Sequence, residues 1–525
     1  SHSMTKFTRV LTLATATALL ATSLVGCSSD KAATNGADKV AVNVNLEGYP
    51  LVDQPITLKA FAFGEPGGGD WKDFPVFQAL NEKTGINVEF QTVSGDGAEE
   101  KLNLTLASNQ LPDVFFSGLS DTMINKYAKM GLFLPLEDLI DQYAPNIKAL
   151  LEERPEIRQA ITMPDGHIYA IPAINGNLDG NVPTKLYLNK TWLDKLGLEV
   201  PKTTDEFKAV LEAFKTQDPN GNGQADEIPF TYEPTPPYNI WNGDTGLSGA
   251  FGVTDSTANL MLRDGEIIFV GTDEGYKEYI KWTRDLYTNK LIDAEIFTQD
   301  HNQYMAKRGS DYVGAYLTHG PADGTATEWI AIEPLKGPEG HQLWSQFEHG
   351  IDKNRAIISA TNQYPEATMR YIDSFFELEN SLNLRYGKTL VEAGDGKYEV
   401  ITLEPGVQTE APGPYVPTLE TPERINEYLV QTESQIASQE RYAMYEPYLA
   451  DALPIFNFTA EESQELSTMA TDIRNFVSEK KAKWTTGQAD IDAEWDSYVE
   501  TLNKMGLERY MEIYRTAYER SLEQQ

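Results

Sequence analysis

The sequence predicts an α/β protein of more than one domain, with a helix-rich carboxy-terminal part. Strand-like and helix-like segments alternate through the first half of the chain, which is typical of α/β folds with mostly parallel sheets. Amphipathic helical patterns dominate the last third. The chain has 525 residues, which is more than one hydrophobic core usually organises, so two or more domains are expected.

The first 27 residues predict a removable signal peptide. Lys6 and Arg9 precede a short apolar stretch diluted by threonines, which ends in the run Leu-Val-Gly-Cys at residues 24–27. A membrane-spanning helix needs about 20 strongly apolar residues, and this stretch is shorter. The ending resembles a bacterial lipobox, in which Cys27 becomes the lipidated first residue of the mature protein. The alternative is an ordinary signal peptide with an incidental cysteine.

Cys27 is the only cysteine in the sequence, which excludes an internal disulfide and a multi-cysteine metal site. A lipid on Cys27 would tether the protein to a membrane surface without spanning it. Residues 28–53 are rich in Ser, Asp, Ala, Asn and Gly. This composition predicts a flexible tether between the lipid and the folded body.

The composition is strongly acidic, with 79 Asp and Glu against 43 Lys and Arg and a net charge of −36. Such a surface repels phosphate backbones, so we expect no nucleic-acid partner. A local pocket can have either sign. The charge favours a neutral ligand over an acidic one, although local cations such as Arg385 or Lys388 would reverse that preference.

Hydrophobic spacing places the elements along the chain. Residues 56–63 alternate as a first strand, which a Gly-rich turn closes. The pattern then predicts a helix, a strand, a helix and a short strand at residues 76–80, 86–93, 102–107 and 113–116. Thr203 and Thr459 each precede a Glu by three residues and then an apolar stripe, so both predict capped amphipathic helices. Two more helices are predicted from Asp490 onward.

A run of oxygen-bearing side chains after the helix that follows Thr203 predicts a structural calcium site. The predicted ligands are Asp218, Asn220, Asn222, Gln224 through its backbone carbonyl, Asp226 and Glu227. Calcium takes six to eight oxygen ligands, and a Gly at the sixth position permits the sharp turn of an EF-hand loop. The twelfth position departs from the EF-hand pattern because it is Pro229. The alternative is a metal-free Asn/Gly turn.

Further segments, with the lipobox and the calcium loop, carry a resemblance to a known family. They include Glu82–Val88, Leu106–Val114, Asp165–Pro172, Trp192–Leu198, Thr361–Ala367 and Ile491–Asp496. In this order and spacing the chain resembles the large, roughly 500-residue solute-binding lipoproteins of carbohydrate ABC importers, over nearly the whole mature chain. The resemblance implies a two-lobed, periplasmic-binding-protein-like fold with a hinge and an interlobe cleft.

The resemblance also implies lobe boundaries and a mechanism. We expect a first lobe at 40–172 plus 353–410 and a second at 173–352 plus 411–525. The protein would capture an oligosaccharide by hinge closure and deliver it to the membrane permease subunits of an ABC importer. It would be a monomer, lipid-anchored on the extracellular face of the cell membrane in the Gram-positive manner, and would do no chemistry.

Loops that follow strands supply the candidate sugar contacts, because ligands of open α/β sheets bind outside the carboxyl ends of strands. Sugars offer CH-rich faces to aromatic rings, and hydroxyls to Asp, Asn and His. The candidates are Asp70, Trp71, Ser117, Asn239, Trp241, His319, Trp344 and Tyr386. Each has an alternative role, since a Trp beside a Gly-rich loop is often a hydrophobic plug and a lone His is often a surface residue.

Two other functions stay open. A receptor for peptides would have the same architecture, although aromatic and amide residues in the loops favour sugar. A secreted polysaccharide-cleaving enzyme is the second alternative, since a carboxylate pair at glycosidase spacing cannot be recognised from sequence. The sequence contains no nucleophile elbow, no His-x-x-x-His zinc pair and no Gly-rich phosphate loop, which disfavours the enzyme.

Overall fold

The computed structural model describes residues 39–322 and 324–524, and the predicted signal peptide with Cys27 and residues 28–38 of the predicted tether lie outside them. The prediction of a flexible tether is wrong for its last residues, because Leu51 and Val52 are buried and the Leu51 N–H donates to the Thr84 carbonyl at 2.9 Å. The chain divides into two compact units, which it joins by crossing three times. The first unit comprises residues up to 174 with 352–420, and the second comprises 175–351 with 421–525. The first unit thus includes residues 411–420, which the sequence placed in the second lobe. There the Tyr415 carbonyl accepts a 2.6 Å hydrogen bond from Ser117 Oγ.

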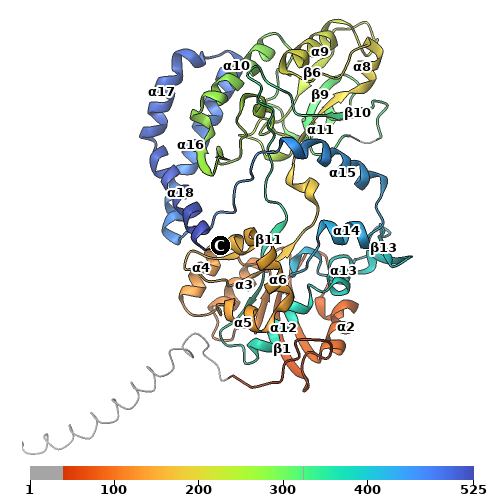
Figure 1. The fold of residues 1–525 in the computed structure, drawn as a ribbon, viewed down its shortest axis with the longest axis vertical. Coiled ribbons are helices and arrows are strands. Elements are labelled where there is room, and N and C mark those ends of the chain that lie inside the picture. The colour runs from red at the N-terminus through yellow and green to blue at the C-terminus, as the bar shows by residue number, and fades with distance from the viewer. Residues whose placement is uncertain (1–38, 323, 525) are drawn as a thin grey trace, which may run out of the picture. The chain divides into compact units, whose positions relative to one another are not determined.

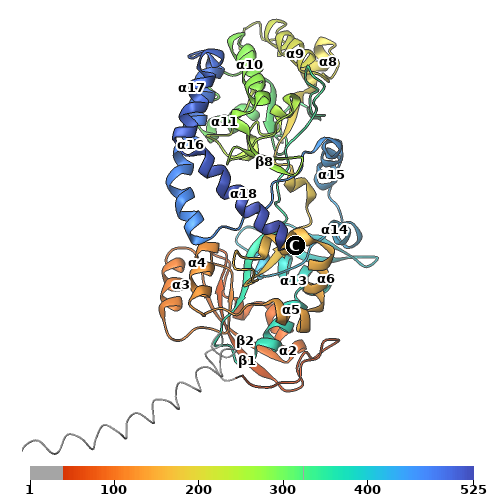
Figure 2. The same ribbon diagram turned by 60° about the vertical axis from the view of Figure 1, so that its left-hand side comes forward.

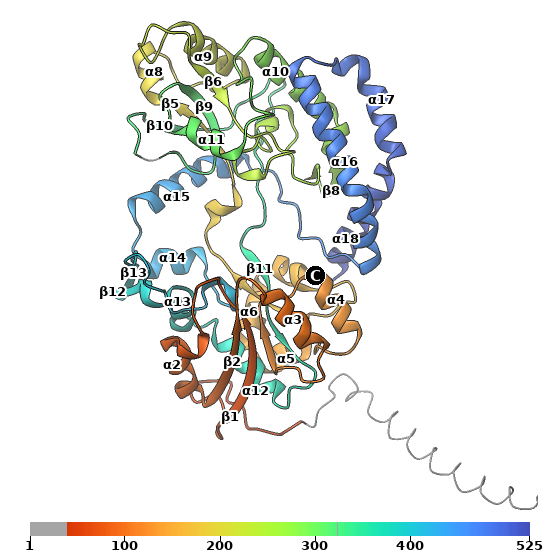
Figure 3. The same ribbon diagram turned by 180° about the vertical axis from the view of Figure 1, so that it is seen from behind.

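The first unit is built on a five-stranded sheet in the order β2-β1-β3-β11-β4. Its strands are β1 (Ile56–Phe63), β2 (Ile86–Val93), β3 (Val114–Phe116), β4 (Ile171–Ile174) and β11 (Ile351–Ile358). β1 lies between β2 and β3 and is parallel to both. Figure 3 shows β1 beside β2. β11 is antiparallel to β3, and the chain enters it on returning from the other unit. The hairpin of β12 (Leu390–Gly394) and β13 (Lys397–Val400) forms a separate two-stranded sheet.

Helices flank this sheet (Figure 1). They are α2 (Pro75–Thr84), α3 (Ala98–Ala107), α4 (Asp121–Lys129), α5 (Glu137–Tyr143), α6 (Pro145–Glu153), α7 (Pro155–Ile161), α12 (Pro365–Ser374) and α13 (Leu378–Tyr386). The predicted strands at 56–63 and 86–93 and the helices α2 and α3 are confirmed. A core cluster forms where Phe61 and Phe115 of the sheet meet Leu102 and Leu106 of α3.

The second unit is built on a four-stranded sheet in the order β10-β5-β9-β6. Its strands are β5 (Lys185–Asn189), β6 (Ile228–Thr231), β9 (Val313–Thr318) and β10 (Trp329–Ile332), with a separate hairpin of β7 (Leu260–Arg263) and β8 (Glu266–Phe269). β6 and β9 are parallel, but β5 is antiparallel to β9 and to β10. The prediction of mostly parallel sheets is therefore wrong here, because local patterns carry no information about strand direction.

The second unit contains the long helices of the carboxy-terminal part (Figure 2). Its helices are α8 (Lys190–Leu196), α9 (Thr204–Thr216), α10 (Glu274–Thr288), α11 (His301–Arg308), α14 (Pro422–Tyr428), α15 (Glu433–Tyr445), α16 (Ala460–Thr486), α17 (Ile491–Lys504) and α18 (Leu507–Glu523). The capping boxes predicted at Thr203 and Thr459 are both present. Among the helices within the described ranges, none has the length and apolar character to cross a membrane.

Candidate functional site

Three of the predicted sugar contacts meet at one edge of the second unit's sheet. β6 and β9 are parallel, with Phe230 opposite Ala315, so the loops that follow them start from the same edge. The loop after β6 carries Asn239 and Trp241, and His319 follows β9 directly. This edge, called the Trp241 edge below, brings the three residues together.

Trp241 is 38% exposed and flanked by two imidazoles. Its ring centroid lies 5.4 Å from that of His319, with the planes at 90°, and 5.1 Å from that of His349, at 46°. Asn239 begins the 3-10 turn Ile240–Asn242, and its Oδ1 accepts the Trp241 N–H at 3.0 Å. An exposed indole held in this way offers a flat apolar face to a sugar ring.

His349 was missed by the sequence analysis. Its backbone N–H donates to Asn181 Oδ1 at 2.9 Å, which fixes the segment beside the Trp241 ring. The only local signal is a His next to Gly350 before a strand, and that pattern is too common to be informative. Its contact with Trp241 joins residues 108 positions apart in sequence, and no local rule predicts such a contact.

A buried ion pair underlies His319. Lys185, opposite Thr318 on the neighbouring strand, pairs with Asp179, and both side chains are buried. The His319 Nε2 atom lies 3.6 Å from Asp179 Oδ2. Burial lowers the pKa of His319, and the Lys185 charge lowers it further while Asp179 opposes the shift. A neutral imidazole results at pH 7, with its Nε2 facing Asp179 and its Nδ1 buried without a hydrogen-bond partner among the described residues.

A second polar network lies behind Trp241. The Thr318 hydroxyl donates to Asn242 Oδ1 at 2.9 Å, and Asn242 Nδ2 donates to Glu233 Oε1 at 2.9 Å. His301 Nδ1 lies 3.0 Å from the same carboxylate oxygen. Thr318, Asn242 and Glu233 are buried, so these bonds fix the end of β9 against the loop after β6.

The predicted contacts at Trp71 and Trp344 do not agree with the structure, because both rings are buried. Trp71 is 2% exposed and stacks on Phe77 at 5.6 Å. Trp344 is 1% exposed, and its Nε1 donates to the Thr184 carbonyl at 2.9 Å. We therefore replace the sugar-contact role of these two residues with packing, which is the alternative considered for each.

The other candidate residues of the first unit form hydrogen bonds within that unit. Asp70 Oδ1 accepts the Lys72 N–H at 3.2 Å and the Thr92 hydroxyl at 3.0 Å, while its side chain stays half exposed. Ser117 is buried, and its Oγ donates to the Tyr415 carbonyl. The Tyr386 hydroxyl donates to the Glu420 carboxylate, and burial raises the pKa of Tyr386.

The predicted calcium loop curls back on itself. Asp226 accepts hydrogen bonds from the side-chain amides of Asn220 at 3.0 Å and Asn222 at 2.6 Å. Gly221 and Gly223 both have positive φ, near 70°, as tight turning requires. Asp218 Oδ2 accepts the Gly223 N–H at 2.9 Å.

Two carboxylate oxygens of this loop are buried and lack a hydrogen-bond partner among the described residues: Asp218 Oδ1 and Glu227 Oε1. Burial raises the pKa of Glu227, and the neighbouring Asp218 and Asp226 raise it further. Unpaired, mutually repelling carboxylate oxygens fit a hard divalent cation. Within the described ranges, however, no group of three or more His, Cys, Asp or Glu residues is arranged to hold a metal ion. A calcium ion in this loop would therefore need amide and backbone oxygens as ligands in addition to the carboxylates.

Comparisons with known proteins agree on one family. The sequence profile described as bacterial extracellular solute-binding protein matches residues 65–373. The fructooligosaccharide ABC transporter substrate-binding protein FusA of Streptococcus pneumoniae is 32% identical over 94% of this chain and 95% of its own.

Solved structures give the same result. FusA in complex with kestose superposes with a TM-score of 0.69 at 31% identity, covering 90% of this chain and 100% of FusA. FusA has also been solved as an EF-hand mutant in complex with fructo-nystose, with a TM-score of 0.68 at 30% identity and the same coverage. An extracellular solute-binding protein from Bifidobacterium longum subsp. infantis gives 0.73 at 25% identity, covering 89% of this chain and 98% of its own.

Proposed function

The chain belongs to the family of bacterial extracellular solute-binding proteins, and from this membership we propose that it captures a fructooligosaccharide and delivers it to an ABC importer. The observation that carries the proposal is the similarity to FusA over nearly the full length of both chains. The Trp241 edge supports it, because an exposed indole beside a neutral imidazole suits an uncharged sugar.

Isothermal titration calorimetry tests this proposal. We expect kestose and fructo-nystose to bind, and an oligogalacturonide and a tetrapeptide of similar size to give no heat. Binding of the tetrapeptide alone would replace the sugar receptor with a peptide receptor. Binding of the oligogalacturonide alone would keep the receptor and overturn the preference for an uncharged ligand.

The protein does no chemistry on this ligand in our proposal. The relatives reported above are substrate-binding proteins, and the polar groups at the Trp241 edge serve as hydrogen-bond partners. Kestose incubated with the protein should be recovered unaltered by chromatography. Release of monosaccharide that a single Asp or Glu substitution abolishes would contradict the proposal.

A structural calcium ion completes the second unit in our proposal. The buried, unpartnered oxygens of Asp218 and Glu227 support it, as does the EF-hand of FusA. Asp218, Asn220, Asn222, Asp226, Glu227 and the backbone carbonyl of Gln224 would hold the ion. It would neutralise the carboxylates and fix the connection between α9 and β6.

The proposed setting is the extracellular face of the cell membrane. The family is extracellular, and one relative over 43% of the chain is the Bacillus subtilis lipoprotein LipO. A lipid on Cys27 would keep a monomeric receptor near the membrane subunits of its importer. Metabolic labelling with a fatty-acid analogue should mark the wild type and leave Cys27→Ser unmarked and released into the medium.

A further inference from the structure

The segment that carries Trp241 is held by groups far from it in sequence. This segment, residues 232–244 and called the Trp241 loop below, leaves the sheet at the end of β6 and contains only the short 3-10 turn Ile240–Asn242. Strand pairing therefore does not fix its course. Two buried lysines do: Lys481 of α16 and Lys307 of α11.

Lys481 anchors the loop at Thr235. Its Nζ donates to the Thr235 carbonyl at 3.0 Å and to Asp244 Oδ1 at 2.9 Å. Asp244 Oδ1 also accepts the Thr235 N–H at 2.9 Å, and Asp244 Oδ2 accepts the Tyr279 hydroxyl at 2.6 Å. Both backbone polar groups of Thr235 are thus fixed by one buried ion pair.

Thr235 links this anchor to Trp241 through two hydrogen bonds. Its hydroxyl donates to the Asn239 carbonyl at 2.7 Å, and Asn239 Oδ1 in turn accepts the Trp241 N–H. A Cβ at Gly243 would overlap the Thr235 hydroxyl, so the two arms of the loop are in close contact. A continuous path of hydrogen bonds runs from the Lys481 ammonium to the backbone of Trp241.

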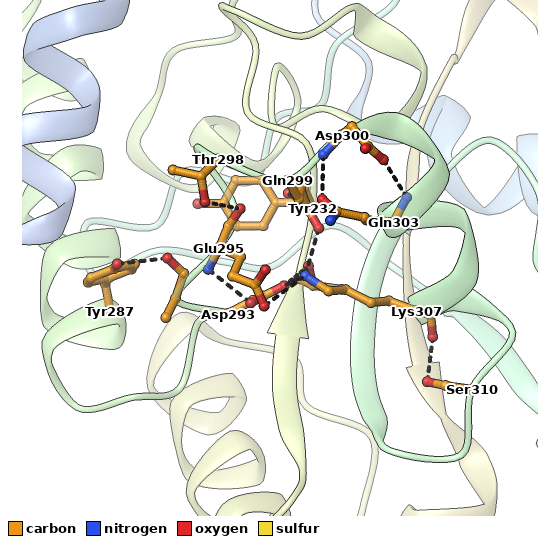
Figure 4. Close-up of polar contacts among 12 residues, drawn as sticks. Tyr232, Tyr287, Asp293, Glu295, Thr298, Gln299, Asp300, Gln303, Lys307 and Ser310 are labelled. Atoms are coloured by element: carbon orange, nitrogen blue, oxygen red, sulfur yellow. Dashed lines mark hydrogen bonds and ion pairs between the residues drawn. The ribbon is translucent and has the colours of Figure 1, made fainter.

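Lys307 anchors the loop at a second place (Figure 4). Its Nζ donates to Asp293 Oδ2 at 2.7 Å and to Gln299 Oε1 at 2.9 Å. Gln299 Nε2 donates to the Tyr232 carbonyl at 3.0 Å, and the Gln299 carbonyl accepts the Tyr238 hydroxyl. The start of the loop and its Pro-rich bend are therefore both tied to α11.

We propose that Lys481 and Lys307 are positioning residues for ligand capture, which hold the Trp241 indole in place before the sugar arrives. The inference rests on the proposed function. Burying an ammonium with its carboxylate adds little net stability compared with apolar residues of the same volume. What the two pairs provide is a fixed place for the loop, and a preordered loop loses less entropy when a ligand binds.

The test compares variants that loosen the loop with one that weakens the fold elsewhere. Lys481→Met combined with Asp244→Asn removes the anchor without leaving the Asp244 carboxylate unpaired. Thr235→Val keeps both lysine pairs and removes only the hydroxyl bond to Asn239, so it serves if the double variant does not fold. Val477→Ala, on the same helix and fully buried, is the matched control for lost stability.

Two measurements are made on each variant. Acrylamide quenching of ligand-free protein, referred to Trp241→Phe, isolates the Trp241 emission from that of the other seven tryptophans. We expect this signal to become about twofold more quenchable in the anchor variants, and the Kd for kestose to rise by roughly tenfold or more, as for other displaced binding groups. Val477→Ala should lower the melting temperature and change neither measurement.

Unchanged Trp241 quenching in a folded anchor variant would overturn the inference. An equal change in Val477→Ala would overturn it too, because general loosening would then explain the effect. The quenching arm needs no ligand, so it remains informative if kestose proves to be the wrong sugar. Failure of kestose to bind the wild type would count against the proposed function alone.

Discussion

The two units each place a tryptophan in a loop after a strand, but the two rings face opposite environments. Asp70 and Asn239 each begin a 3-10 turn and accept the N–H two residues further on. Trp71 comes one residue after its cap and is buried, whereas Trp241 comes two residues after its cap and is exposed. Because a 3-10 helix has three residues per turn, one position rotates a side chain by about 120°.

This difference separates a buried packing residue from an exposed ring that we propose contacts the ligand. The indole of Trp71 lies among Phe77, Phe90 and Phe116. The indole of Trp241 has only imidazole rings within aromatic contact distance among the described residues. In these two turns the offset from the capping residue accompanies the difference in exposure, although both tryptophans lie in loops that follow strands.

Trp71→Ala gives the largest expected effect, on stability. Removing a buried Trp costs about 3–5 kcal/mol, because it leaves a cavity among the rings that it contacted. Scanning calorimetry should show the first unit melting at a much lower temperature, with the heat of kestose binding preserved at low temperature. An unchanged melting profile together with lost binding would reverse the roles of the two tryptophans.

One buried carboxyl group in each unit extends the comparison to the pH dependence of stability. Burial raises the pKa of Asp255 in the second unit to about 7, and that of Asp373 in the first unit to about 6. The folded state therefore holds a proton that the unfolded chain releases near pH 4, so stability falls as pH rises through each folded-state pKa.

The second unit should show the larger pH effect. Between pH 5 and 8, Asp255→Asn should gain up to about 3 kcal/mol on the wild type, and Asp373→Asn about 1 kcal/mol, since one pKa unit is worth about 1.4 kcal/mol. Melting temperatures measured at pH 5, 6.5 and 8 test this. A gain that is equal at all three values would show that neither group titrates in this window.

Calcium removal should act on one unit only. The predicted loop lies between α9 and β6 of the second unit, so chelation should lower the melting temperature of that unit and leave the first unchanged. At a calcium concentration a hundredfold above its Kd, the lost stabilisation is about 2.7 kcal/mol. Asp218→Asn should lower the response to chelator. An identical melting curve with and without chelator, and no metal by elemental analysis, would leave a metal-free Asn/Gly turn.

Local signals in the sequence predicted the helices and strands. The features that were not predicted depend on contacts between residues far apart in the sequence. The capping boxes at Thr203 and Thr459 depend on residues three apart, and both were predicted correctly. Whether β5 runs parallel or antiparallel to β9 depends on chain connections that no local pattern records. The sequence therefore defined helices and strands well and sheet direction poorly.

The candidate site shows the same difference between local signals and long-range contacts. Asn239, Trp241 and His319 are candidates because loops that follow strands can be recognised from local sequence, and their contact with sugar stays a prediction. Lys481 was missed because it reaches Thr235 from 246 positions away. The burial of Trp71 was not predictable either, since the sequence shows the residue beside a Gly-rich loop but not the direction in which its 3-10 turn points it.

Trp241→Ala is expected to change the affinity for kestose and not the stability, and it sharpens the comparison most. Loss of a stacking anchor at a binding site costs about 2 kcal/mol, which corresponds to a roughly 30-fold rise in Kd. Because the ring is exposed, the melting temperature should stay within a degree or two of the wild type. The double variant Ile240→Trp with Trp241→Ile keeps one indole but moves it by one position. If the offset from the cap decides ring direction, calorimetry should show this variant binding kestose as weakly as Trp241→Ala; wild-type affinity would instead mean that the loop needs only an indole, at either position.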